Sequence, residues 1–504
     1  MPSARSWTLA ATIIGSSLTF VDATVVNVSL PALQADLQAT ITDVQWVIEA
    51  YALFLGGLIL VGGSLGDQFG RKRVFLAGVW LFTLASIACG IAASTRALIV
   101  ARAIQGVGAA FLVPGSLAII SATFDEADRG RAIGTWSGFS AITSAIGPVA
   151  GGWLTEHVSW RAVFFINVPL AATVVVLAGR FISESRDDSR SSRVDWTGAA
   201  LAVIGLGAIV FGLLEWPGPA ADRQIVIGAM TVGVLSLVAL VIVEGRVPTP
   251  MVPLRLFCSR TFTLANVLTL LLYGALAMLL WLLPMELIQV KRYSPTAAGA
   301  ALLPLPLLLF ALSRWSGGLV ARIGSRLPLT LGPIVAAAGL FLLARAGHSG
   351  SYWTTVFPAV MVLGFGMSIV VAPLTTTAMS AVDAHHAGVA SGVNNAVSRI
   401  AGLIAIALLG VVLVRSFDLR VGTALDRLAL PAEARASINR ELPKLAGADV
   451  DAAVAGEDRA AVRGAIDDSF TSAFRLVMNV AAGLALTAAA AGAFLPAVAT
   501  SPNG

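Results

Sequence analysis

Apolar segments long enough to cross a lipid bilayer recur fourteen times along this 504-residue chain. A transmembrane α-helix needs about 20 mostly apolar residues, and its backbone polar groups must be satisfied within the segment. The segments lack the period-2 alternation of a membrane β-barrel. Only 12% of the residues are charged, which excludes an ordinary soluble domain. The sequence therefore predicts an all-α polytopic membrane protein with spans at residues 8–30, 46–65, 74–93, 97–121, 132–155, 163–182, 196–215, 224–243, 262–286, 297–320, 327–346, 353–380, 388–414 and 473–497.

The distribution of Lys and Arg predicts the orientation of these spans. With the N-terminus in the cytoplasm, the loops on that side carry fifteen basic residues and the short loops on the other side carry six. Cytoplasmic loops of membrane proteins are enriched in basic residues. We therefore expect a multi-pass protein of the cell (inner) membrane with both termini cytoplasmic. The basic residues form no patch interleaved with aromatic side chains, so we expect no nucleic-acid partner.

Two polar segments divide the chain into three parts. The run ESRDDSRSSRVD at 184–195 follows the sixth span, and the run EGRVPTPMVPLRLFCSR at 244–260 follows the eighth. They predict an N-terminal six-helix bundle at 1–183, a linker with two additional helices and an inner loop at 184–260, and a C-terminal six-helix bundle at 261–504. We expect the two additional helices to pack laterally as accessories, since the two bundles complete the fold without them.

A repeated sequence supports two related halves. GSLGDQFGRKR at 63–73 follows the second helix of the first bundle, and GGLVARIGSR at 317–326 follows the second helix of the last bundle. Two six-helix halves related by an axis along the membrane normal form one large class of transporters, whose substrate site lies between the halves.

The segment at 415–471, between the last two spans, is long and carries both signs of charge. Its helical spacing predicts short amphipathic helices on the outer surface. The default interpretation is a solvated insertion without transport chemistry, because surface loops tolerate insertion well.

Three charged residues inside the spans are the strongest candidates for function. Asp22 lies near the middle of the first span, and intramembrane acids are functional by default. Arg102 lies inside the fourth span, and its guanidinium stays protonated, so it would tune a carboxylate rather than carry a proton. Glu49 lies near the end of the second span, either as a peripheral acid of the cavity or as a surface residue that reaches water.

Several motifs resemble those of the major facilitator superfamily. GSLGDQFGRKR resembles its signature loop, LIVARAIQGVGAA at 98–110 its fourth-helix motif, and TSAIGPVAGG at 143–152 the fifth-helix motif of its antiporters. With VDATVVNVSLPAL in the first span, WRAVFFINVP at 160–169 and fourteen spans, the chain resembles the fourteen-helix drug:proton antiporter family over essentially its whole length. ASGVNNAVSRIAG resembles the family's helix-thirteen motif around Arg399, but Ile400 and Ala401 stand where the family often has Gln and Gly.

The resemblance implies a role for each motif. Arg102 is assigned to proton coupling, which we extend to Asp22 and Glu49. The signature loop is implied to be a conformational latch, in which glycines permit a tight turn and charges hold the loop. Its expected partner is the charged segment Asp125 to Arg131. The latch residues are Gly63, Asp67, Gly70, Arg71 and Arg73. The fifth-helix motif is implied to be a hinge and seal, since small residues let helices approach closely and proline can kink a helix; its residues are Gly147, Pro148, Gly151 and Gly152.

These observations predict a transporter rather than an enzyme. The sequence contains no catalytic constellation, phosphate loop or metal spacing, so we expect no cofactor and no metal ion. The resemblance implies a proton-coupled antiporter that exports lipophilic small molecules by alternating access, and Asp22 with Glu49 would suit a cationic substrate. Its expected partners are protons, the substrate and the lipid bilayer; no feature specifies a periplasmic or membrane partner protein. The alternatives are an uptake symporter of the same fold, and a non-transporting receptor or membrane enzyme.

Overall fold

The computed structural model describes residues 4–186, 194–216, 222–247, 250–345, 350–382, 387–428, 430–454 and 458–496, and these residues form helices without any strand. Thirteen helical segments are long and apolar enough to cross a membrane. The remaining predicted span, at 132–155, falls in α5, a 32-residue helix that packs against α1. The all-α prediction is confirmed, and in the described residues every predicted span falls on one helix or on consecutive helical elements.

The N-terminal bundle contains seven helical elements: α1 (Ala4–Asp36), α2 (Ile41–Phe69), α3 (Arg71–Gly90), α4 (Thr95–Thr123), α5 (Glu126–His157), α6 (Ala162–Phe165) and α7 (Asn167–Phe181). Local sequence signals fix several of these boundaries. Thr40 and Asp43 form a capping box at the start of α2, which satisfies backbone donors that the first turn leaves free. The backbone of Gly70 has φ +107°, a conformation that glycine adopts readily, and separates α2 from α3.

The C-terminal bundle is built from α10 (Arg260–Met285), η2 (Glu286–Val290), α11 (Pro295–Ala301), α12 (Pro304–Gly317), α13 (Leu319–Ile323), α14 (Arg326–Ala344), α15 (Tyr352–Ser380), α16 (Ala387–Asp426) and α19 (Asp458–Ala493). The predicted span at 297–320 is interrupted between α11 and α12, immediately before Pro304. Proline lacks a backbone N–H and clashes with the preceding turn, so a break at this point is expected.

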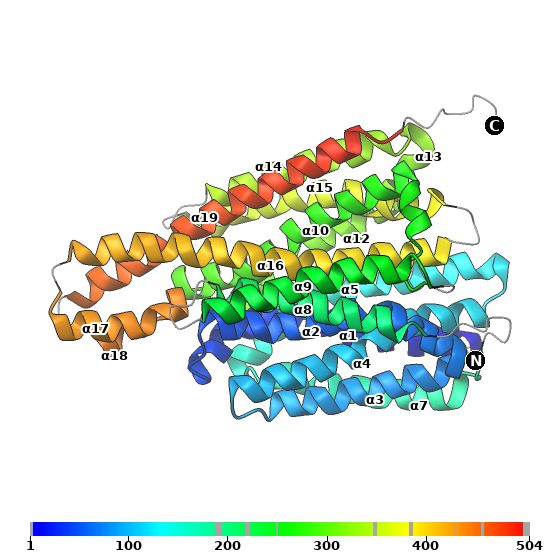
Figure 1. Cartoon of the computed structure of the whole chain (residues 1–504), viewed down its shortest axis with the longest axis horizontal. Coiled ribbons are helices and arrows are strands. Elements are labelled where there is room, and N and C mark those ends of the chain that lie inside the picture. Colours follow the sequence, from blue (N-terminus) through cyan, green and yellow to red (C-terminus); the bar gives the residue numbers. More distant parts are fainter. Residues whose placement is uncertain are drawn as a thin grey trace.

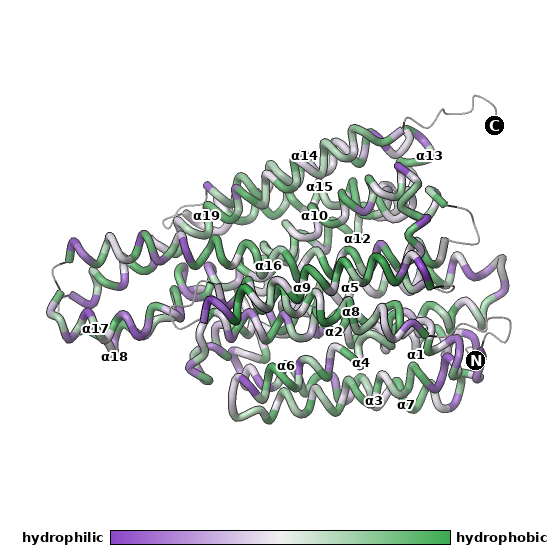
Figure 2. The backbone as a smooth tube through the Cα atoms, in the orientation of Figure 1, coloured by the Kyte–Doolittle hydropathy of each residue, from purple (hydrophilic) through white to green (hydrophobic). Residues whose placement is uncertain are grey.

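The beginning of α1 and the end of α19 lie at the same end of the elongated molecule (Figure 1). We call this end, which includes residue 4 and the α2–α3 junction at Gly70, the proximal end. The distal end carries the connections at 37–40, 91–94 and 158–161. The apolar surface of the helices covers the middle of the bundle, whereas hydrophilic residues gather at the two ends (Figure 2). This distribution is the one that a protein spanning a bilayer requires.

The two bundles meet along two seams. In the first seam α2 packs against α16, and in the second α5 packs against α11 and α12. The largest apolar core joins the distal parts of α1 and α2 to the C-terminal bundle, through residues such as Leu30, Val44 and Leu282. A separate core lies within the N-terminal bundle around Phe75 and Phe82.

The two additional helices are α8 (Trp196–Glu215) and α9 (Arg223–Glu244). Helix α8 covers the first seam, because Leu206 and Val210 pack with Leu53 of α2 and Leu403 of α16. Helix α9 packs against α8, and only 11% of the residues in its apolar stretch are buried. The pair therefore lies beside the bundles, with α9 outermost.

The segment at 415–471 does not form a loosely solvated insertion. Helices α16 and α19 continue beyond the bundle at the distal end and are connected through α17 (Ala432–Glu441), η4 (Leu442–Gly447) and α18 (Val450–Ala453) (Figure 1). The short helices match the prediction, but Ile438, Leu445 and Ala446 are buried in the main core. The default interpretation of a solvated insertion is therefore wrong, since this segment buries apolar side chains against both bundles.

The η4 turn lies over the junction between the bundles. Gln289 of η2 donates to Gln34 of α1 at 2.7 Å, and Gln34 donates to the Lys444 carbonyl at 3.1 Å. The Lys444 ammonium donates to Gln38, in the turn that follows α1, at 2.6 Å. Leu445 holds a left-handed backbone with φ +52°, which costs free energy for a side chain of this kind. These contacts tie the distal segment to the N-terminal bundle.

Candidate functional site

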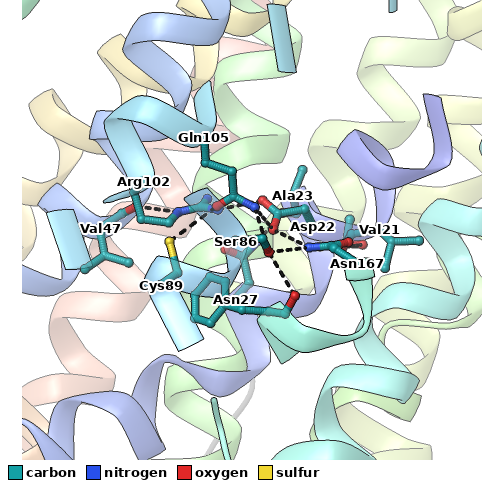
Figure 3. A network of polar contacts seen from close by, with 12 residues as sticks. Val21, Asp22, Ala23, Asn27, Val47, Ser86, Cys89, Arg102, Gln105 and Asn167 are labelled. Carbon is teal, nitrogen blue, oxygen red and sulfur yellow. Dashed lines mark hydrogen bonds and ion pairs between the residues drawn. The ribbon is translucent and has the colours of Figure 1, made fainter. Parts of the chain in front are cut away.

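The candidate site is a buried polar cluster in the N-terminal bundle, centred on Asp22 of α1 (Figure 3). Asp22 is fully buried, and Arg102 of α4 is 2% exposed. The Arg102 Nη1 lies 2.6 Å from the Asp22 Oδ2, so the two charges form an ion pair. The structure therefore brings together two of the three residues predicted for proton coupling.

Neutral polar side chains complete the coordination of the Asp22 carboxylate. Its Oδ1 accepts hydrogen bonds from Gln105 Nε2 at 2.8 Å and from Asn167 Nδ2 at 3.3 Å. Both amides also donate to Ser86 Oγ, at 3.3 and 3.0 Å. The carboxylate on α1 is thus held by side chains of α4 and α7, and Ser86 of α3 binds both of its amide partners, so that four helices meet at one anionic centre.

Arg102 is held on its other sides as well. Its Nε donates to the Val47 carbonyl at 3.1 Å, and its Nη1 donates to Gln105 Oε1 at 2.8 Å. The guanidinium carbon lies 4.2 Å from the centre of the Tyr51 ring, within the range of a cation–π interaction. These contacts connect the ion pair to α2, the helix that forms the first seam with the C-terminal bundle.

The sequence pointed to the charged pair but not to all its partners. Ser86 and Asn167 were not identified as candidates, although each is a polar side chain within an apolar segment. Asn167 lies within the motif WRAVFFINVP, and burial of its amide next to Asp22 gives that motif a structural reason. Polar groups buried in a membrane need partners, so the presence of polar residues within the spans could have identified Ser86 and Asn167 as candidates.

Glu49 lies away from this cluster. It is fully buried, so the alternative of a surface residue that reaches water is wrong. In the part of the chain that the structure describes, neither carboxylate oxygen has a hydrogen-bond partner. One turn away on the same face of α2, Gln45 donates to the Ile406 carbonyl of α16 at 3.2 Å. Glu49 therefore lies on the seam between the bundles, whereas Val47 and Tyr51 of α2 face Arg102.

The residues predicted as a latch form a compact turn at the proximal end. Arg71 donates to Asp67 Oδ1 at 2.8 Å, which connects the last turn of α2 to the first turn of α3. The Glu184 carboxylate, beyond α7, accepts from the backbone N–H of Lys72 at 3.0 Å and of Arg73 at 3.2 Å. A negative charge at a helix N-terminus is favourable. Gly63 lies on the face of α2 that packs against Pro114 of α4.

The partner predicted for this turn was the charged segment Asp125 to Arg131. In that segment Asp125 pairs with Arg5 at 2.9 Å. Among the described residues, the carboxylate that contacts the turn is that of Glu184, which the sequence did not identify because it lies 112 positions beyond Lys72. The turn lies in the N-terminal bundle, and its carboxylate belongs to the first residue of the linker that follows.

The residues predicted as a hinge lie on the distal half of α5 and contact two neighbours. Gly147 packs on Thr24 and Gly151 on Val25, both in α1. Gly152 packs on the backbone of Pro295 in α11, and Gly299 of α11 packs on the backbone of Pro148. The backbone N–H of Thr296 donates to Glu156 Oε2 at 3.1 Å. This stretch therefore joins α5 to its own bundle and to the other bundle, with no room for larger side chains.

The proximal half of α5 differs from its distal half. At Gly130, Gly134 and Gly138 an added Cβ would meet no described atom within 4 Å. Contact between the bundles along α5 is therefore tight at the distal end and absent around these glycines at the proximal end. The conformation is one in which the second seam is closed distally.

Two six-helix bundles that meet across a central seam, with a buried ion pair in one of them, define a secondary membrane transporter. Residues 12–406 match the family model of the Major Facilitator Superfamily. The chain belongs to this superfamily and is a transporter rather than an enzyme.

Relatives named for drug resistance or export are similar over most of the chain. The multidrug resistance protein Stp of Mycobacterium tuberculosis is 36% identical over 407 residues, which cover 81% of this chain and 75% of that protein. The tetracenomycin C resistance and export protein of Streptomyces glaucescens is 31% identical over 503 residues, which cover 97% of this chain and 91% of that protein.

A solved structure is similar in fold. A bacterial homologue of the human lysosomal transporter Spinster, in its inward-facing and unoccupied conformation, matches with a TM-score of 0.68 at 18% identity, over 97% of this chain and 98% of that chain. This likeness confirms the arrangement of the helices.

Proposed function

We propose that this protein is a proton-coupled antiporter that exports lipophilic small molecules, including drugs, across the cell membrane. The proposal extends to this chain the resistance and export roles named for its relatives. The Asp22–Arg102 pair supports the coupling part of the proposal, because its carboxylate is completely enclosed and is bound by side chains of α4 and α7.

The proton acts at the Asp22 carboxylate. Protonation neutralises that group and removes its charge interaction with Arg102, which stays protonated. The neutral acid keeps acceptor capacity for Gln105 and Asn167, so α3, α4 and α7 stay connected while the link from α1 to Arg102 weakens. Arg102 is also bonded to Val47 of α2, and a change in the pair therefore reaches the first seam.

Alternating access follows from the two seams. The tight glycine contacts between α5 and α11 seal the distal end in this conformation, and the opposite conformation requires them to separate. In the proposed orientation both termini are cytoplasmic, the distal end faces outward, and the turn around Gly70 holds the proximal end of the N-terminal bundle. Protons enter from the outside as substrate leaves.

Replacement of Asp22 by asparagine tests this proposal. In inverted membrane vesicles, Asp22→Asn should abolish substrate accumulation driven by a proton gradient. Asp36→Asn is the matched control, because Asp36 lies on the same helix and pairs with Arg161 at 2.6 Å, but its side chain is 47% exposed. Proton-driven accumulation that persists in Asp22→Asn would refute the coupling role, and accumulation in the same direction as the proton flux would indicate an uptake symporter.

A folding control is needed, because Asp22→Asn leaves Arg102 without its counter-charge. The double variant Asp22→Asn with Arg102→Gln removes both charges from the cluster. Both variants should retain the elution profile of the wild-type protein in detergent, and the double variant should also lack proton-driven accumulation. A double variant that transports normally would contradict the proposal.

A further inference from the structure

The charged side chains in the membrane spans differ in how far they are exposed. Among the charged side chains that the structure describes, Asp22, Arg102 and Arg399 lie well inside the apolar spans, and Glu49 lies near the end of its span. Asp22 and Glu49 are fully buried and Arg102 is 2% exposed, whereas Arg399 is partly exposed. Since Asp22 is neutralised by Arg102, a molecule between the bundles does not meet an open carboxylate in this conformation.

Arg399 lies on α16 where elements of both bundles converge. Its Cβ lies in van der Waals range of a Cβ placed at Gly56, on α2. Its guanidinium carbon lies 5.9 Å from the centre of the Phe20 ring of α1. The cation therefore lies where α16 of one bundle faces α1 and α2 of the other, with the Phe20 ring beside it.

This guanidinium is not satisfied by the protein around it. Its Nε is buried and has no hydrogen-bond acceptor among the residues described. The salt bridges within the same set of residues do not include Arg399. A cationic side chain inside a membrane protein is costly without a partner, and guanidinium donors are arranged to bind carboxylate-like groups.

The neighbours of Arg399 on α16 hold it in place. Asn394, one and a half turns earlier, donates to Thr269 Oγ1 of α10 at 2.7 Å and to Asn266 Oδ1 at 3.2 Å. Ile400 packs in the apolar cluster with α2 and α8, and Ala401 packs against Gly274 of α10. Ile400 and Ala401, the two departures from the family motif, thus make apolar contacts at helix seams and leave Arg399 as the polar group of this turn.

We propose that Arg399, with the ring of Phe20, forms a substrate subsite that selects planar aromatic compounds carrying an ionised phenol or carboxylate. The oxyanion accepts hydrogen bonds from the guanidinium, and the aromatic body packs on the ring. A few polar groups in an apolar site are sufficient to orient a lipophilic ligand. A cationic substrate, which the acids Asp22 and Glu49 suggested from sequence, would be repelled by Arg399 and meet no accessible counter-charge.

This inference is tested by a binding experiment and by a transport experiment. Only the transport experiment rests on the proposed export function. The purified full-length protein in detergent should be titrated with three planar aromatic probes of one scaffold: a phenolate, its neutral methyl ether, and an amine cation. The wild-type protein should bind the phenolate about tenfold or more tightly than the methyl ether, since hydrogen bonds to charged groups contribute about 1.5–3 kcal/mol. The amine should bind most weakly.

Two variants at this position separate charge from shape. Arg399→Gln should bind the phenolate and the ether equally, and Arg399→Lys should restore part of the preference because it keeps the charge. Arg420→Gln, on the exposed distal part of the same helix, is the matched control and should retain the full preference. Tighter binding of the amine than of the phenolate by the wild type would overturn the inference, as would a preference for the phenolate that survives Arg399→Gln.

The transport arm distinguishes failure of this inference from failure of the proposed function. Proteoliposomes should export the bound phenolate under an imposed proton gradient. If the phenolate binds with the expected preference and is not transported, the export function fails and the subsite stands. If all three probes are exported without discrimination, the export function stands and the subsite is refuted.

Discussion

Gly152→Ala should open the distal seam. An added Cβ at Gly152 would lie 2.8 Å from the Thr296 Cα and 2.7 Å from the Pro295 carbonyl carbon, and both are backbone atoms of α11 that cannot rotate away. Overpacking of a tight contact costs about 1–3 kcal/mol. Because the contact joins the two bundles, this cost applies to the distally closed conformation and is relieved when the bundles separate. A shift of that size changes the equilibrium by about 5- to 150-fold.

Cysteine accessibility can measure this shift. The exposed Cys258 is replaced by serine, and Gln34→Cys is added as a reporter, because Gln34 is 1% exposed and contacts Gln289 across the junction. Gly152→Ala should accelerate labelling of this cysteine by a membrane-impermeant maleimide by several-fold or more. Gly138→Ala on the same helix is the control, since no described atom lies within 4 Å of its Cβ. Equal labelling rates in the two variants would refute the idea that α5 and α11 form the distal closure.

Two further substitutions test the charged groups. Arg102→Gln leaves the Asp22 carboxylate buried without its counter-charge and should lower the free energy of unfolding by about 3–5 kcal/mol. Arg161→Gln, which breaks the exposed pair with Asp36, should lower it by about 1 kcal/mol or less. Thermal melts in detergent compare the two variants, and similar losses of stability would contradict the burial argument. Glu49→Gln should leave the number of protons transported per substrate molecule unchanged, because Glu49 lies on the face of α2 away from Arg102. A lower number in reconstituted vesicles would show that Glu49 shares the proton with Asp22.

The sequence predicted the helical architecture because each apolar run carries its own evidence. A span of about 20 apolar residues must satisfy its backbone internally, so its structure follows from composition alone. The break before Pro304 and the turn at Gly70 are likewise local properties of the residues concerned. The division into two bundles followed from a repeat of the signature loop.

Contacts between distant segments were harder to predict. The pairing of Asp22 with Arg102 follows from the cost of isolated charge in lipid, but the choice of Ser86 and Asn167 as further partners depends on how four helices pack. The same limit applies to Glu184, which reaches the turn at Gly70 from beyond α7. Burial of Glu49 depends on which face of α2 meets α16, and the position of this residue near a span end left contact with water open as one of two alternatives.

The distal segment shows the same limit on a larger scale. Its charge and its helical spacing describe α17 and α18 correctly, but they do not reveal that Leu445 and Ala446 insert into the core at the junction of the bundles. That insertion depends on the amides of Gln34 and Gln289, which are more than 100 residues away in sequence. Burial at such a junction is a property of the assembled fold.

The most direct test of the central claim is the proton release that accompanies substrate binding. In a weakly buffered detergent solution with a pH indicator, addition of an exported compound to the wild-type protein should release protons, because substrate binding and protonation of Asp22 oppose each other. The account predicts no release from Asp22→Asn and wild-type release from Asp36→Asn. Undiminished release from Asp22→Asn would contradict it and would place the coupled proton on another residue.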